Sequence, residues 1–77
     1  MEDLLEYLAR ALVENPDEVS VESFEEDDGT TVLELSVAED DMGKIIGKGG
    51  RTVNSLRTVM RACSVRHGGR VVVDIVD

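Results

Sequence analysis

The spacing of apolar residues over positions 3–14 predicts an amphipathic helix. Leucine, alanine and valine recur at i, i+1, i+4, i+5, i+8 and i+9, which is one stripe at helical spacing. Asn15-Pro16 follows and ends the helix. The polar side of the pattern is acidic, whereas helices that lie on membrane surfaces are rich in Lys and Arg. We therefore expect this helix to cover one face of a sheet.

The next two apolar runs alternate as strands do. Val19 and Val21 are separated by a polar residue, although the pattern leaves the facing of Phe24 open. Residues 25–29 form a polar turn that ends in Asp-Gly, a strong hairpin signal between two alternating runs. The second run, residues 32–37, places three apolar side chains on one face: Leu33, Leu35 and Val37. The sequence thus predicts a β-hairpin after the first helix.

Residues 39–63 predict two further helices on either side of a glycine-rich tract. Glu39, Asp40 and Asp41 can supply an N-cap and first-turn carboxylates for a short helix over residues 42–46. We favour that role over a metal site, because no His or further acid recurs at ligand spacing. The helix after the glycines has an apolar arc of Val53, Leu56, Val59, Met60 and Cys63, and Arg51, Asn54, Arg57 and Arg61 fall on the opposite arc.

The last residues predict a helix end and a strand. Cys63 is expected to be a buried small apolar residue. Val65 is out of phase with the apolar arc, so it lies either past the helix end or exposed for a partner. His67-Gly68-Gly69 ends the helix, with Gly68 as its C-cap. Residues 70–76 then alternate between two faces, Val71, Val73 and Ile75 on one and Val72, Asp74 and Val76 on the other.

Charge is divided unevenly between the two halves of the chain. The net charge of −9 argues at first against a nucleic-acid partner, since such domains are usually basic. However, residues 1–42 hold 15 acidic side chains and one basic, whereas residues 43–77 hold seven basic and two acidic. A local basic surface attracts phosphate within a Debye length of about 8 Å, even on an acidic body. The acidic half itself is best explained as a solvated surface.

Composition excludes several classes of protein. At 77 residues the chain is long enough for one domain. Apolar runs such as residues 71–73 fall far short of the roughly 20 residues that span a bilayer. The acidic start lacks the positive charge of a secretory signal, so we expect a cytoplasmic protein. One Cys and one His, with no third group at a useful spacing, leave no assembled catalytic site, so we expect no enzyme, metal or cofactor.

The tract Gly43-Lys44-Ile45-Ile46-Gly47-Lys48-Gly49-Gly50 carries the candidate chemistry. It combines flexible backbone and positive charge with the N-terminus of the following helix, a combination that favours phosphate. The triphosphate loop G-x-x-x-x-G-K-[ST] fits in no register, and the dinucleotide fingerprint fails because Thr52 stands where its third glycine belongs. What fits is I-I-G-x-x-G between two helical patterns. The alternative is a simple chain reversal.

This motif and the order helix, strand, strand, short helix, GXXG, helix, strand resemble the type II KH domain, in which the accessory helix and strand precede the core. With Ile-Ile-Gly-Lys-Gly-Gly-Arg-Thr-Val the chain is similar to the small bacterial single-KH proteins of the KhpA family. The resemblance implies an α+β fold, with a three-stranded mixed sheet packed on one face by three helices. It also implies a single KH domain over residues 1–77 with its GXXG loop at residues 47–50.

For function, the resemblance implies a non-catalytic, single-stranded RNA-binding protein, an RNA chaperone or post-transcriptional regulator linked to cell division and elongation. It also implies a homodimer, or a heterodimer with a larger KhpB/Jag-type KH protein. Val65, the outer face of the last strand and the first helix are candidate dimer surfaces. The alternative is a protein–protein interaction module in which the glycine loop is structural and the acidic face docks a basic partner.

Carried over onto this sequence, the family's RNA-binding positions lie in and around the glycine loop. Arg57 joins them through its place on the polar arc. The expected RNA-binding residues are Lys44, Ile45, Ile46, Gly47, Lys48, Gly49, Gly50, Arg51, Thr52, Asn54 and Arg57.

Overall fold

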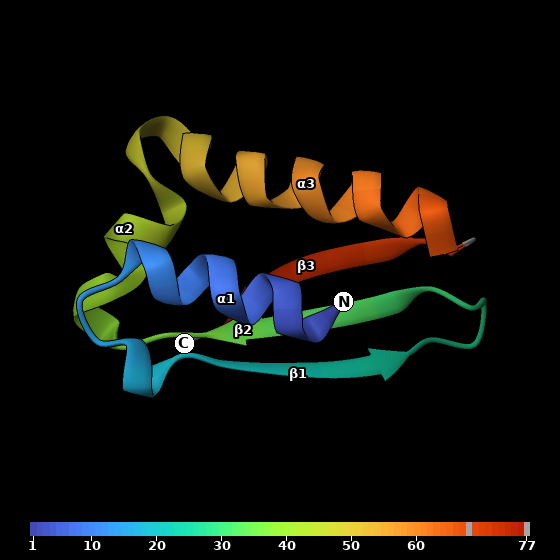
Figure 1. Cartoon of the computed structure of the whole chain (residues 1–77), viewed down its shortest axis with the longest axis horizontal. Coiled ribbons are helices and arrows are strands. Elements are labelled where there is room, and N and C mark those ends of the chain that lie inside the picture. The colour runs from blue at the N-terminus through green and yellow to red at the C-terminus, as the bar shows by residue number, and fades with distance from the viewer. Residues whose placement is uncertain (68, 77) are drawn as a thin grey trace.

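The computed structural model describes residues 1–67 and 69–76, and the side chains of all of these except residues 66 and 67. The elements follow one another in the predicted order (Figure 1). They are helix α1 (Glu2–Leu12), 3₁₀ turn η1 (Pro16–Glu18), strands β1 (Ser20–Glu25) and β2 (Thr31–Ser36), turn η2 (Glu39–Asp41), helix α2 (Met42–Ile46), turn η3 (Lys48–Gly50), helix α3 (Arg51–His67) and strand β3 (Val71–Val76).

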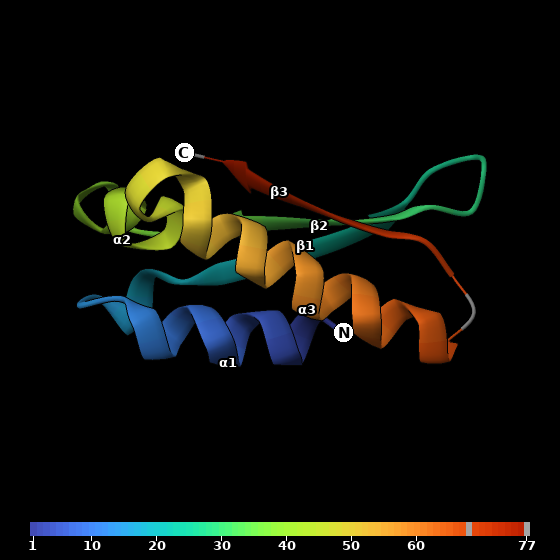
Figure 2. The ribbon, with the colours of Figure 1, turned by 90° about the horizontal axis from the view of Figure 1, so that it is seen from above.

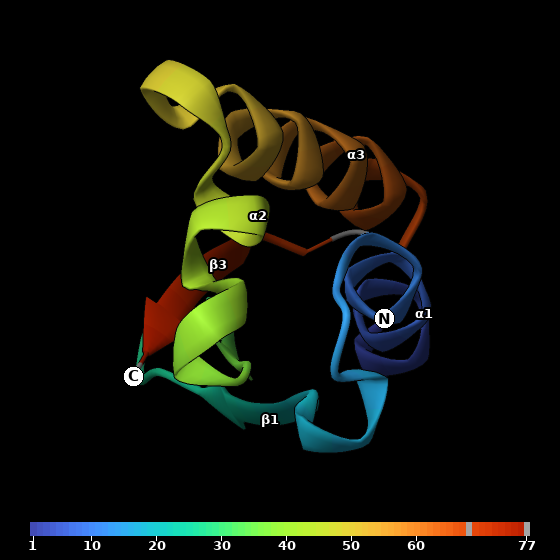
Figure 3. The same cartoon turned by 90° about the vertical axis from the view of Figure 1, so that its left-hand side faces the viewer.

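Across the described residues, three strands form one mixed sheet in the order β1-β2-β3. The hairpin makes β1 antiparallel to β2, and the crossover through α2 and α3 makes β3 parallel to β2. The three helices cover one face of this sheet (Figure 3), and α3 runs diagonally over it beside α1 (Figure 2). The expected α+β architecture is confirmed, and it leaves β3 as an edge strand.

The core lies between the helix layer and the sheet. Alternation along the strands points odd-numbered side chains such as Leu33 and Leu35 of β2 toward the helices. Buried positions of α1 fall on the stripe that the sequence predicted. The buried cluster contains Leu5, Ala9, Val19, Leu33, Leu35, Ile45, Leu56, Met60 and Val73.

The hairpin turn closes as its Asp-Gly pair predicts. The Glu26 N–H donates to the Thr30 carbonyl (2.8 Å) and the Gly29 N–H to the Glu26 carbonyl (3.0 Å), with Gly29 at φ +89°. The loop of residues 27–29 thus ends in a glycine with positive φ, which is typical of three-residue hairpin loops. The register pairs Phe24 with Val32, so Phe24 lies on the sheet face away from the helices, which answers the question that its sequence pattern left open.

The buried arc of α3 is displaced from the predicted one. Met60 lies at the centre of the buried arc. Each residue turns the helix by about 100°, so the neighbouring residue Val59 points about 100° away from that centre. Val59 is therefore directed away from the sheet and is 42% exposed, so its predicted burial is wrong. Ser64 takes a buried place that the sequence did not assign, and Cys63 is half-buried rather than buried. Arg57 was expected on the exposed arc but is half-buried at the other border.

Two expectations concern the end of α3. The sequence allowed Val65 to lie either past the helix end or exposed on the helix. It lies within α3 and is 76% exposed. The predicted C-cap, Gly68, lies outside the described residues. No helix in the part of the chain described here is long and apolar enough to cross a membrane.

Candidate nucleic-acid interface

The glycine loop has a backbone conformation that side chains disfavour. Gly47 ends α2 by donating its N–H to the Gly43 carbonyl (2.9 Å), with φ +75° and ψ 171°. Gly49 and Gly50 follow with φ of +65° and +79°. L-residues avoid these angles, so glycine at these three positions lets α2 and α3 join through so short a loop.

The loop backbone lies directly against the start of α3. A Cβ added to Gly47 would stand 2.8 Å from the Thr52 nitrogen and 2.7 Å from the Thr52 Cβ. Space beside Gly49 is open, since nothing lies within 4 Å of a Cβ there. The Gly50 N–H donates to the Gly47 carbonyl (3.2 Å) and the Arg51 N–H to the Lys48 carbonyl, so the loop donors left for a ligand are the N–H groups of Lys48 and Gly49. They lie next to the positive end of the dipole of the 17-residue helix α3.

Side chains around the loop fall into accessible and inaccessible groups. Lys48, Arg51 and Asn54 are exposed, and Ile46 is 40% exposed beside them. Ile45 is fully buried in the core, so its side chain cannot join the groove that we expected it to line. Lys44 is exposed, but its Nζ lies 3.8 Å from Glu14 Oε1, in an ion pair that solvent weakens.

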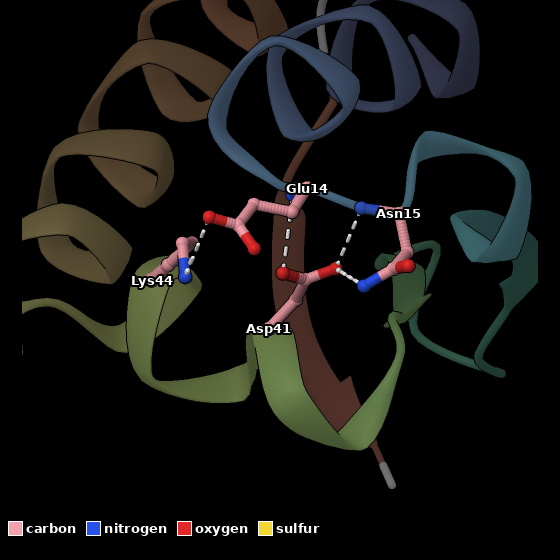
Figure 4. Close-up of polar contacts among 4 residues, drawn as sticks. All are labelled: Glu14, Asn15, Asp41 and Lys44. Carbon is pink, nitrogen blue, oxygen red and sulfur yellow. Dashed lines mark hydrogen bonds and ion pairs between the residues drawn. The ribbon is translucent and has the colours of Figure 1, made fainter.

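Asp41 positions α2, and through it the loop, by bonding to the chain that leaves α1 (Figure 4). Its carboxylate accepts the N–H groups of Glu14 (3.1 Å) and Asn15 (3.0 Å) and the Asn15 side-chain amide (3.0 Å). Asp41 is the N-cap residue of α2, as expected, but among the described residues its side chain makes no cap bond to that helix. The carboxylate instead accepts hydrogen bonds from backbone N–H groups that lie 26 and 27 residues earlier in the chain.

The same contacts set the protonation of Asp41. Burial of the side chain opposes its ionisation, but the hydrogen bonds from Asn15 and Glu14, helped by the charge of Lys44, outweigh burial and lower the pKa below its usual value. Asp41 therefore stays ionised at neutral pH and holds the α1–α2 junction together.

Arg57 joins α3 to the edge of the sheet. Its Nε donates to the Val73 carbonyl (3.3 Å). Thr31 of β2 donates its N–H to the Arg70 carbonyl (2.8 Å), so even-numbered residues of β3 pair with β2. Backbone groups of the odd-numbered residues Val71, Val73 and Ile75 consequently face the free edge, below α3. These edge groups are candidate RNA contacts that the sequence could not reveal, because a local sequence pattern does not determine the order of strands in a sheet.

Helix α3 divides the predicted contacts between two sides. Arg51 and Thr52 line a groove between α1 and α3, whereas Arg57 lines a cleft between α3 and β3. Asn54 is exposed near the loop. The loop, Lys48 and Asn54 thus lie close together, whereas Arg51 and Arg57 lie on different sides of α3.

Accessory helix and strand before the core, a GXXG loop between two helices and a mixed three-stranded sheet define a type II KH domain. The KhpA/KhpB KH-domain family model matches residues 2–75, and the chain belongs to this family, whose members are non-catalytic. Similar curated proteins are each named RNA-binding protein KhpA. That of Halalkalibacterium halodurans is 50% identical and that of Clostridium acetobutylicum 47%, with 100% and 99% of this chain covered and 100% of each relative.

Solved structures show the same fold at low sequence identity. The chain is similar to part of Era from Aquifex aeolicus bound to GDP and aluminium fluoride, with a TM-score of 0.64 and 22% identity, over 96% of this chain and 28% of that one. Era in complex with MgGDPNP and nucleotides 1506–1542 of 16S ribosomal RNA matches with the same values. At this identity the likeness supports the fold alone.

Proposed function

We propose that this protein is a single-stranded RNA-binding protein whose loop, residues 47–50, clamps the RNA backbone. The observation that carries the proposal is the three-glycine loop set against the N-terminus of α3, with Lys48 exposed between the glycines. The names of its relatives, RNA-binding protein KhpA, support the same class of ligand. Loops of this kind hold about four nucleotides in KH domains.

Each part of the site has a chemical role in this proposal. Phosphate oxygens accept hydrogen bonds from the N–H groups of Lys48 and Gly49, beside the N-terminus of α3, while the Lys48 side chain adds positive charge. Ile46 offers an apolar contact to a base face. The free edge of β3 offers N–H and C=O groups to base edges. Backbone recognition of this kind suits single strands, whose bases are not paired.

The acidic body limits how tightly one such site can bind. Residues 1–42 repel RNA outside the loop, so affinity depends on a few contacts and on salt. Release of counterions from three or four phosphates gives a log–log slope against salt of roughly −2 to −3 on a single strand.

The test is fluorescence anisotropy with a labelled single-stranded RNA pool at several salt concentrations. Lys48→Asp/Gly49→Asp places two carboxylates against the phosphates and should abolish binding. Lys48→Gln/Gly49→Asn is the matched control: it keeps similar shapes, and asparagine, like aspartate, tolerates the left-handed angle of Gly49. Circular dichroism checks that both variants fold. Equal binding by wild type and the aspartate variant would remove the loop from the RNA site.

We also propose that the protein pairs with a second copy through a groove between α1 and α3. The groove has a volume of about 290 Å³, and Leu8, Leu12 and Val59 line it. Leu12 and Val59 are each 42% exposed, so this groove presents apolar surface that a partner could cover. A second copy would cover them and bring two weak RNA sites together, which raises avidity. The KH domain of a larger KhpB/Jag-type protein is the alternative occupant, since one family model describes both.

Dimerisation is tested by sedimentation at several protein concentrations. Val59→Asp places a charge in the groove and should leave a monomer. Thr58→Asp is the matched control, because it adds the same charge to α3 at an exposed position that does not line the groove. If wild type is monomeric alone, the same pair of variants is tested for binding to a KhpB-type KH domain. A dimer that survives Val59→Asp contradicts this surface.

In the cell we propose a cytoplasmic RNA chaperone or post-transcriptional regulator, linked to cell division and elongation as in the resembled family. A small acidic module with one weak site per copy suits reversible contact with many transcripts. A strand-annealing assay with complementary RNAs tests the chaperone activity. No acceleration by wild type, in conditions where anisotropy shows binding, would reject it.

The open face of the sheet favours a second candidate, a protein-docking module. The strand register aligns two rows across the three strands, acidic Glu22, Glu34 and Asp74 and apolar Phe24, Val32 and Val72. A basic segment with an apolar anchor would complement both rows. A synthetic peptide of alternating Lys and Val is a probe for calorimetry, with Glu22→Gln/Glu34→Gln as the test variant. Absence of binding by wild type would reject this candidate.

A further inference from the structure

Strand β1 has a free edge that the site described above does not use. Within the part of the chain that the structure describes, β1 pairs with β2 alone, so it borders the sheet opposite to β3 (Figure 1). Five of its six residues are exposed, and Val21 is half-buried. We propose that this edge binds an extended, basic segment of a partner protein, which joins the sheet as a fourth strand. The inference goes beyond RNA binding, because the edge of β1 includes neither the glycine loop nor β3.

The register shows which backbone groups of β1 face this edge. The Glu26 N–H donates to the Thr30 carbonyl (2.8 Å), and hydrogen-bonded pairs alternate along an antiparallel ladder. Even-numbered residues of β1 therefore bond to β2, and the N–H and C=O groups of Val21, Ser23 and Glu25 face the free edge. Extended peptides bind to exposed sheet edges through such groups.

The strand is regular enough to receive a partner. Its register with β2 runs without a bulge from Ser20 to Glu25, and residues 20–25 contain no proline or lysine. Bulges, prolines and lysines commonly protect edge strands from pairing with other chains. Here the charged residues are glutamates, which repel an acidic strand and attract a basic one. The edge of β3 differs, because Arg57 donates to the Val73 carbonyl there.

Charge determines which partner suits the edge of β1. Residues 11–43, which include this strand, hold 12 acidic side chains and no Lys or Arg. Such a surface repels RNA. Pairing with β1 of a second copy would bring the glutamates of both strands together, and like charges on neighbouring strands destabilise a sheet. The same charges favour a basic protein segment.

A basic strand at this edge gains contacts on both faces of the sheet. Side chains alternate along β1, so Glu22 and Phe24 lie on the open face and Glu25 on the helix face. Lys or Arg side chains of the added strand would lie next to Glu22 and Glu25, while Phe24, 47% exposed, offers apolar surface. For its class of partner the inference rests on the docking candidate above, but here backbone hydrogen bonds hold that partner.

The first experiment measures the anisotropy of a labelled peptide of alternating Lys and Val, as long as β1, at low salt. Ser23→Pro removes one N–H from the free edge and leaves the ladder with β2 intact, because edge strands tolerate proline where the N–H faces solvent. It should weaken peptide binding about tenfold, the upper range for one lost hydrogen bond, since its ring also keeps the peptide away. Ser23→Ala is the matched control and should not change binding. Circular dichroism checks that both variants fold.

A second measurement uses wild type and does not depend on the folding of a variant. Peptide binding should slow amide hydrogen exchange at Val21, Ser23 and Glu25, whose N–H groups gain acceptors. Exchange at Val71 and Val73, at the free edge of β3, should stay the same. The same peptide N-methylated at every residue keeps its charge but loses its backbone donors, and it should bind more weakly and protect none of these groups.

The outcomes separate this edge from the open face of the sheet. Equal peptide affinities for Ser23→Pro and Ser23→Ala, or protection at β3 instead of β1, overturn the proposal. Binding that survives Ser23→Pro but is lost in Glu22→Gln/Glu34→Gln rejects the edge and supports the docking candidate alone. If the peptide does not bind wild type, docking fails at both surfaces. RNA affinity should be unchanged in Ser23→Pro, so none of these results decides the proposed RNA-binding function.

Discussion

Replacing Gly47 by alanine tests whether backbone conformation shapes the glycine loop. The angles of Gly47, φ +75° and ψ 171°, belong to a region that only glycine commonly occupies. A side chain there costs about 1–3 kcal/mol of conformational strain. The added Cβ would also contact the Thr52 side-chain oxygen and come within 2.8 Å of the Thr52 nitrogen.

That contact involves backbone, so a rotamer change cannot relieve it. Crowding of this kind adds about 1–3 kcal/mol, which gives a total of about 2–6 kcal/mol if the loop keeps its shape. For a domain of this size, each kcal/mol lowers the melting temperature by about 4–8 °C. If the loop moves instead, the first turn of α3 moves with it, and RNA binding should weaken at temperatures where the variant is folded.

Gly49→Ala is the internal comparison for this prediction. Its angles, φ +65° and ψ 22°, are left-handed and cost alanine about 1–2 kcal/mol, but no atom lies within 4 Å of the added Cβ. Urea unfolding of both variants, with anisotropy on RNA, measures the difference. Gly47→Ala should unfold at a clearly lower urea concentration and bind RNA more weakly. Equal midpoints and equal RNA affinities would refute the reasoning.

Three further predictions concern the rest of the fold. The contacts that lower the pKa of Asp41 stabilise the fold at pH values above the unfolded-state pKa of about 3.9. This stabilisation is lost as pH falls through the lower folded-state pKa. The free energy of unfolding of Asp41→Asn in urea should therefore depend less on pH below about pH 5 than that of wild type. Met60→Ala should lower the free energy of unfolding by about 2–5 kcal/mol through the cavity it leaves. Val65→Ala, at an exposed position of the same helix, should change it by less than about 0.5 kcal/mol. Equal losses for the two variants would contradict the burial of Met60 at the centre of the buried arc of α3. Arg10→Ala should change thermal stability by less than about 1 kcal/mol, because its ion pair with Glu6 is solvent-exposed, and a larger loss would contradict this.

The order of elements and the glycine loop were predictable because they depend on neighbouring residues. Leu5 and Ala9 lie at helical spacing, and Asp28-Gly29 closes a hairpin through local hydrogen bonds. The predictions that failed concern which neighbour a residue meets. Val59 fits the apolar arc of an isolated helix, but the position of α3 against the sheet leaves it outside the core.

Asp41 shows the same difference, between what neighbouring residues predict and what tertiary contacts decide, for a polar group. In sequence it stands where an N-cap belongs, and only the fold brings two N–H donors from the segment that follows α1 within 3.1 Å of its carboxylate. The free edge of β3, and the cleft between α3 and β3 that Arg57, Arg61 and Arg70 line, likewise required the strand order β1-β2-β3.

The sequence by itself therefore determined the elements, the family resemblance and the loop, since helical period, strand period and glycine backbone are local properties. Only the tertiary structure decided which side chains the loop can use, such as Ile46 rather than Ile45, and which arginines share one cleft. Burial and long-range hydrogen bonds depend on how the layers pack, and packing is a property of the whole chain.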